Sequence, residues 1–145
     1  MRKLGLGLIA LFALLLTPSF AQEVESDVIA RGNLVVTKDL LIYEITEPGS
    51  GRIAKIGDQV EVHYTGWLID GTKFDSSMDR EQTFRFRLGA KKVIPGWERG
   101  VSGMKIGETR ELIIPPNLAY GKQGAGGFIS PNAVLLFKIQ LLSIN

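Results

Sequence analysis

A large aromatic side chain, Trp97, follows two β-branched residues and a proline in the run Val93-Ile94-Pro95-Gly96-Trp97. Proline suits the first position of a helix because its missing N–H would have no intrahelical partner there. Trp97 then lies in the first turn of a short helix, where its indole either fills the core or forms the floor of a pocket. Which of the two it does decides the function. Other aromatic residues could form the walls of such a pocket: Tyr64, Phe74, Phe84, Phe86, Tyr120 and Phe137.

The reactive groups of common enzymes are scarce in this sequence. With one histidine and no cysteine, a zinc site lacks its usual ligands. Ser76 and Ser77 have only His63 as a possible base, and the sequence has no G-x-S-x-G motif, which disfavours serine hydrolysis. The glycines within 121–127 are not followed by G-K-[ST], so they predict a turning loop and not a phosphate site. Four polar side chains remain among the aromatic ones: Tyr64, Asp75, Arg80 and Tyr120.

Alternation of apolar and polar residues predicts the strands that must position these side chains. Residues 59–67 and 83–88 alternate as half-buried antiparallel strands do, and a long final strand is expected over 133–144. His63 falls on the polar face of the first of these strands and is interpreted as a surface residue. The side chains expected to face inward are Val60, Val62, Tyr64, Phe84, Phe86, Leu88, Leu135, Phe137, Ile139 and Leu141.

Turn residues separate further strands and leave one short helix. Strands are expected over 40–46 and 109–114, and Asp70-Gly71 predicts a hairpin turn before Phe74. The only clear helix after the first 21 residues spans 95–101. Five or six antiparallel strands with a single helix to cover their apolar face predict an α+β fold. A length of 145 residues fits one domain.

The N-terminal 21 residues are typical of a secretory signal peptide. Arg2 and Lys3 precede an apolar stretch that ends at Leu16, and small residues at 19 and 21 suit cleavage near Ala21. The stretch is short for a membrane span of roughly 20 residues. Residues 22–37 are then predicted to be a flexible leader, because their first part is polar and lacks periodicity. We therefore expect a protein that is periplasmic or secreted.

Loss of the signal peptide would remove two of the 17 basic residues and none of the 15 acidic ones. The mature chain would be formally neutral, which argues against nucleic acid as a partner, because nucleic-acid-binding proteins present a basic face. An exported chain without cysteine must also fold without disulfide bonds.

A set of short motifs occurs in one order along the chain. They are V-H-Y-T-G (62–66), D-G-x-x-F-D-S-S (70–77), L-G (88–89), V-I-x-G-W-x-x-G-V (93–101), M-x-x-G (104–107), A-Y-G (119–121) and P-N-A-x-L-x-F (131–137). Together they resemble the FKBP-type peptidyl-prolyl cis–trans isomerases over residues 38–145. The resemblance implies a five-stranded antiparallel sheet wrapped around one short helix, with the ligand pocket between them.

The resemblance also implies roles for individual residues. Trp97 would form the pocket floor under a substrate proline ring, and the Ile94 N–H and Tyr120 hydroxyl would donate hydrogen bonds to substrate carbonyls. Asp75 would lie beside Tyr64 as an orienting group, with Arg80 placed to pair with it. The remaining substrate-binding residues would be Phe74, Phe84, Val93, Phe128, Ile129 and Phe137. No metal or cofactor is implied.

Two departures from typical members concern the pocket's surroundings. The loop at 122–131 lacks the usual His-Pro-Gly and Pro-Pro and carries a large Phe128. Lys92 stands where an acidic residue is common, which would alter contacts with partners. Neither change affects the pocket floor.

The expected function is acceleration of X-Pro isomerisation in unfolded or maturing exported proteins, with macrolides as expected inhibitors. The alternative is a non-catalytic binding module or holdase chaperone on the same fold, since a fold does not by itself fix function. Some surface-exposed bacterial members dimerise through a long N-terminal helical segment. The 22–37 stretch is too short for one, so a monomer is expected.

Overall fold

The computed structural model describes residues 28–145. The predicted signal peptide and the first part of the predicted leader lie outside these residues. Within the described part, no helix is long and apolar enough to span a bilayer. The elements are β1 (Val28–Arg31), β2 (Leu34–Thr37), β3 (Ile42–Glu47), β4 (Gln59–Leu68), β5 (Lys73–Ser76), β6 (Phe84–Arg87), α3 (Pro95–Val101), β7 (Thr109–Ile114), the 3-10 turn η1 (Pro116–Leu118) and β8 (Leu135–Ile144).

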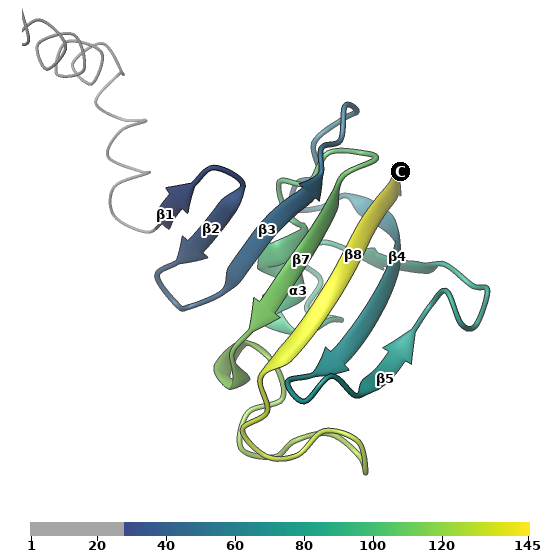
Figure 1. Cartoon of the computed structure of the whole chain (residues 1–145). Helices are drawn as coiled ribbons and strands as arrows, with labels where there is room; N and C mark the ends of the chain where they lie inside the picture. Colours follow the sequence, from purple (N-terminus) through teal and green to yellow (C-terminus); the bar gives the residue numbers. More distant parts are fainter. Residues whose placement is uncertain (1–27) are drawn as a thin grey trace, which may run out of the picture.

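All the described strands belong to one antiparallel sheet in the order β1-β2-β3-β7-β8-β4-β5, and β6 pairs with β4 beyond this path. The two ten-residue strands, β4 and β8, lie next to each other along almost their whole length. Helix α3 lies on one side of the sheet, behind β7 and β8 in Figure 1. This arrangement confirms the predicted α+β fold, an antiparallel sheet with one short helix.

The predicted alternation is also the alternation of burial. In β4, Val60, Val62 and Tyr64 are buried whereas the residues between them are half-buried. The inward residues of β8 are buried too, from Leu135 to Leu141. The core therefore lies between the sheet and α3, and the side chains that alternate inward build it.

Residues 28–37 correct the prediction of a flexible leader over 22–37. They form a hairpin of β1 and β2, and β2 pairs with β3. Both strands are rich in β-branched residues, and Gly32 supplies the positive φ (62°) that a two-residue hairpin turn requires. The sheet of the described residues therefore has eight strands, more than the five or six expected.

Two glycines allow α3 to approach β7 unusually closely. A Cβ at Gly96 would lie 2.4 Å from Cγ2 of Ile114, and one at Gly100 would lie 2.0 Å from Cδ2 of Leu112. Both partners are strand residues with fully buried side chains. Glycine at these positions therefore sets the distance between helix and sheet.

Gly100→Ala is expected to lower the free energy of unfolding by about 1–3 kcal/mol, the usual range for overpacking a core. Alanine's better helix propensity, worth about 1 kcal/mol, offsets part of this cost. Gly127→Ala is the matched control, because its Cβ would meet nothing within 4 Å. Urea denaturation measures both; equal midpoints for the two variants would contradict the close-packing argument.

Candidate active site

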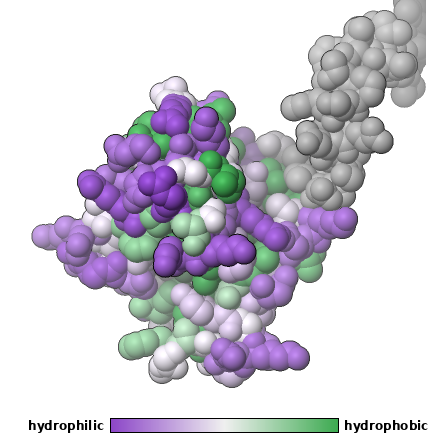
Figure 2. Space-filling model, turned by 180° about the vertical axis from the view of Figure 1, so that it is seen from behind, coloured by the Kyte–Doolittle hydropathy of each residue, from purple (hydrophilic) through white to green (hydrophobic). Residues whose placement is uncertain are grey.

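A cavity of about 180 Å³ lies where the start of α3 faces the inner side of the sheet. It is mostly aromatic, with one carboxylate and one ammonium side chain among its lining residues. Figure 2, which shows the molecule from the side opposite to Figure 1, has patches of hydrophobic surface separated by hydrophilic residues. The cavity is lined by Tyr64, Phe74, Asp75, Phe84, Lys92, Val93, Ile94, Trp97, Tyr120 and Phe137.

Trp97 is both core and cavity lining. Its side chain is only 4% exposed. Its ring packs edge-on against Tyr64, Phe84 and Phe137, with centroids 4.8, 5.9 and 5.3 Å away, and it is tilted against Phe86 at 5.7 Å. Edge-on contacts of this kind favour one ring orientation over others. The indole is therefore fixed in place before any ligand enters.

The short strand β5 reaches the cavity because β4 has a glycine opposite it. A Cβ at Gly66 would lie 2.7 Å from both the Phe74 and Phe137 rings. Without one, these rings meet edge-on at 5.6 Å. Gly66 thus makes room for two walls of the cavity.

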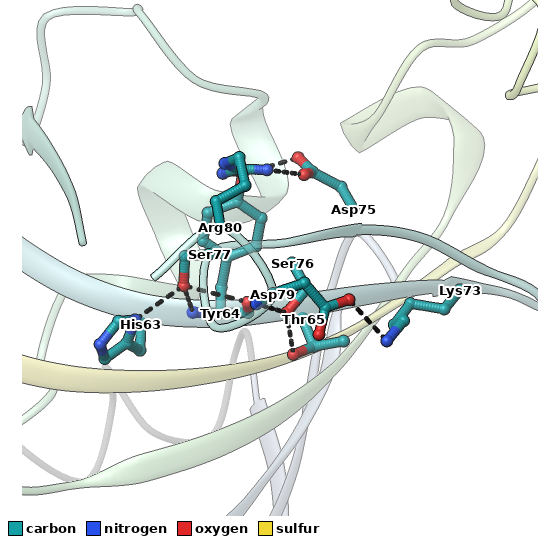
Figure 3. Close-up of polar contacts among 9 residues, drawn as sticks. All are labelled: His63, Tyr64, Thr65, Lys73, Asp75, Ser76, Ser77, Asp79 and Arg80. Atoms are coloured by element: carbon teal, nitrogen blue, oxygen red, sulfur yellow. Dashed lines mark hydrogen bonds and ion pairs between the residues drawn. The ribbon is translucent and has the colours of Figure 1, made fainter. Parts of the chain in front are cut away.

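Tyr64, Asp75 and Arg80 form a hydrogen-bonded group at the cavity edge. The Tyr64 hydroxyl donates to Oδ2 of Asp75 at 2.6 Å, and Nη2 of Arg80 donates to the Tyr64 hydroxyl at 2.8 Å. Arg80 also forms an ion pair with Oδ1 of Asp75 (Figure 3). The predicted placement of these three residues is confirmed.

This group shifts the proton affinities of its members in opposite directions. Burial alone would raise the pKa of Asp75, but the hydrogen bonds from Tyr64 and Arg80 and the Arg80 charge outweigh it and lower that pKa. Burial, together with the bond to Asp75, raises the pKa of Tyr64. At neutral pH the carboxylate is therefore ionised and the phenol protonated.

Ser77 fixes the backbone of Tyr64. The sequence suggested this serine only as a nucleophile, and that role was rejected. Its fully buried hydroxyl accepts from the Tyr64 N–H at 2.8 Å and lies 2.9 Å from Nδ1 of His63 (Figure 3). A second bond joins the Thr65 and Ser76 hydroxyls at 3.1 Å. The serines of the D-S-S motif thus hold β5 and the Asp75 that it carries against β4.

Sequence reasoning also missed a buried ion pair that holds the end of α3. Arg110 on β7 pairs with Glu108, and its Nη1 donates to the carbonyls of Gly100 and Ser102 at 3.2 and 3.4 Å. These carbonyls lie at the C-terminal end of a seven-residue helix whose N-cap residue, Ile94, forms no side-chain capping bond. The guanidinium also lies 4.5 Å from the centre of the Tyr43 ring. Arg110 therefore fixes the helix that carries Trp97.

The cavity brings together nine of the twelve residues that the sequence assigned to a site. Arg80 contributes through Asp75 and Tyr64 and does not line the cavity. Phe128 is 75% exposed, and Ile129 is buried in the core cluster. Neither of these two lines the cavity, so their role in binding stays a prediction. Within residues 28–145, no group of three or more His, Cys, Asp or Glu side chains is placed to hold a metal ion.

Arg80→Met is expected to raise the pKa of Asp75, because it removes both a hydrogen bond and a positive charge that lower it. A lowered folded-state pKa contributes stability at neutral pH, and this contribution is lost as the pH falls through that pKa. The variant should therefore lose less stability than the wild type on acidification. NMR titration of the Asp75 carboxyl carbon measures the shift. Lys73→Met, which removes only the exposed pair with Asp79, should leave the Asp75 titration unchanged; an equal shift in both variants would contradict the assignment.

Comparisons with known proteins agree with this geometry. Residues 50–142 match the FKBP-type peptidyl-prolyl cis–trans isomerase family. FK506-binding protein 2 of Yarrowia lipolytica is 46% identical over 138 residues, covering 95% of this chain and 90% of the relative. An FK506-binding protein of Neisseria meningitidis serogroup A is 50% identical over 104 residues, covering 72% of this chain and 95% of the relative.

Two solved structures share the fold. The crystal structure of AtFKBP13 matches with a TM-score of 0.73 and 36% identity over 79% of this chain and all of that chain. FkpA from Escherichia coli matches with the same TM-score and 42% identity, again over 79% of this chain, but the match spans only about half (53%) of FkpA. By its matched residues and its fold, this chain belongs to the FKBP-type peptidyl-prolyl cis–trans isomerase family.

Proposed function

We propose that this protein accelerates cis–trans isomerisation of X-Pro bonds in exported proteins that are folding, and that Trp97 supports the proline ring. The observation that carries the proposal is the aromatic cavity, which is lined by a buried indole together with a small set of hydrogen-bonding groups. Such a cavity suits an apolar five-membered ring. The flanking peptide groups would remain at the polar edge.

The chemistry needs no covalent step. Rotation about an X-Pro bond is slow because it breaks amide resonance, with a barrier of about 18–20 kcal/mol. The twisted transition state is less dipolar at the carbonyl than the planar ground states, so an apolar, water-poor cavity disfavours the ground states. A thousandfold acceleration corresponds to about 4 kcal/mol of such differential stabilisation.

Backbone and hydroxyl groups at the cavity edge would orient the substrate. The Ile94 carbonyl accepts from the N–H groups of Trp97 and Glu98 at 2.9 and 3.2 Å, which fixes the Ile94 backbone beside the cavity. Its N–H is assigned to one substrate carbonyl, and the half-exposed Tyr120 hydroxyl to another. Both would hold the flanking carbonyls in the geometry of the twisted state.

Asp75 acts as an orienting and electrostatic group and not as a general base. Both of its oxygens are already engaged, by Tyr64 and Arg80, and its lowered pKa makes it a weak proton acceptor. Its role is to fix the Tyr64 ring, which forms a wall of the cavity. The apolar side chains of Phe74, Phe84, Val93 and Phe137, which also line the cavity, supply apolar contact.

Export, partners and assembly state rest on the sequence. The N-terminal 21 residues suit a cleaved signal peptide, which supports a periplasmic or secreted protein acting on proline-containing, unfolded polypeptides. The mature chain's neutral charge supports no role with nucleic acid. Relatives named FK506-binding proteins support binding of macrolides of that kind in the same cavity. A monomer is proposed.

Trp97→Leu is expected to reduce kcat/KM on X-Pro tetrapeptides at least tenfold, a loss of about 1.4 kcal/mol of transition-state stabilisation. The matched control is Trp67→Leu, because Trp67 alternates to the outer face of β4. Circular dichroism and urea denaturation verify that both variants fold. Full activity in the Trp97 variant would overturn the cavity assignment, and a folded but inactive wild type would favour the binding module or holdase.

The pH profile of kcat/KM should be flat between about pH 5 and 9. The pKa of Asp75 lies below its ordinary value near 4 and that of Tyr64 above its ordinary value near 10, so neither titrates in this range. Asp75→Asn should lower kcat/KM without introducing a pH dependence. An acid limb in the wild type that disappears in Asp75→Asn would show instead that Asp75 is a base.

A further inference from the structure

The cavity lining includes one ammonium group, that of Lys92, which forms no ion pair in the described residues. Lys92 lines the cavity immediately before Val93 and Ile94, and its side chain is exposed. Among residues 28–145 the Lys92 ammonium takes part in none of the hydrogen bonds or ion pairs of the structure. It is therefore available to a ligand.

The nearby carboxylates are committed elsewhere. Asp75, the only carboxylate that lines the cavity, is bound by Tyr64 and by Arg80. Glu98, on α3, turns to the backbone and accepts from the N–H groups of Gly89 and Lys91 at 2.6 and 3.0 Å. Among the residues that line the cavity, Asp75 is paired with Arg80, so the Lys92 ammonium is the lining charge that has no ion-pair partner within residues 28–145.

We propose that Lys92 gives this isomerase a preference for proline segments with an acidic residue next to the proline. The inference rests on the proposed function, because it places the proline ring on Trp97 and its neighbours at the cavity edge. A lysine carries its charge on a flexible four-carbon stem, so it can follow a carboxylate on either side of the ring. Aspartate and glutamate are then attracted and lysine and arginine repelled.

The size of the preference follows from the exposure of Lys92. Ion pairs between exposed side chains change an equilibrium by roughly two- to fivefold, and salt screens them. The preference should therefore appear in kcat/KM at low ionic strength and shrink at high ionic strength. A preference set by side-chain shape would survive added salt.

The test uses tetrapeptides with Glu, Leu or Lys immediately before or after the proline, with wild type, Lys92→Met and Lys92→Glu. In the wild type at low salt, kcat/KM for the Glu peptide should exceed that for the Lys peptide by about two- to fivefold in at least one position. The ratio should fall to near one in Lys92→Met and reverse in Lys92→Glu. Lys138→Glu, an equal change of charge on the exposed face of β8, should retain the wild-type ratio.

Other results of this experiment would contradict either the role of Lys92 or the proposed function. In one such result, the wild type and both Lys92 variants all turn over the Leu peptide and show the same ratio of kcat/KM between the Glu and Lys peptides. That result would overturn the role of Lys92 and leave the proposed function intact. If Lys138→Glu changed the Glu-to-Lys ratio of kcat/KM as much as Lys92→Glu does, the preference would come from the net charge of the protein and not from Lys92. If no peptide is turned over, the proposed function fails. Peptide affinity, followed by Trp97 fluorescence in a Trp67→Phe background, still tests Lys92: equal affinity for Glu and Lys peptides would overturn it.

Discussion

The close contact between α3 and β7 is the constraint on which the rest of the molecule depends. A seven-residue helix is far too short to be stable alone in water, so its position comes from what it packs against. Two glycines bring it against Leu112 and Ile114, and a buried guanidinium binds carbonyls at its C-terminal end. These contacts fix the position of the first turn of α3 and of the Trp97 indole that it carries.

The contact between α3 and β7 also determines where the cavity lies. The helix fixes one wall, β4 and β8 fix another, and the aromatic rings between them lock one another through edge-on contacts. The polar group at the edge is built by local chain geometry instead. Asp75 and Arg80 are five residues apart in one segment of the chain and form an ion pair. Ser77, in the same segment, forms a hydrogen bond with Tyr64 on β4. Packing thus sets the floor, and hydrogen bonding sets the edge.

Much of this could be predicted from the sequence because its signals are local. The two-residue alternation located β4, β6 and β8 with their inward faces, and Pro95 located the start of α3. The contacts that were missed join distant or irregular segments: Arg110 with the end of α3, and Ser77 with Tyr64. The 28–37 hairpin was missed because the prediction of a leader over 22–37 relied on the polar first part of that stretch and not on the β-branched residues that follow. The path of the loop carrying Phe128 depends on close backbone approaches, such as that of Gly124 to the Ile129 carbonyl, which no side-chain pattern encodes.

The double membership of Trp97, in the core and in the cavity, couples recognition to stability. A molecule that binds in the cavity contacts a side chain that is also part of the core, and because it binds only the folded protein, binding raises the free energy of unfolding by mass action. The indole Nε1 is also buried and has no hydrogen-bond partner among the described residues. Evolution therefore cannot remodel the floor of this cavity to suit a new ligand without also changing how firmly the domain holds together.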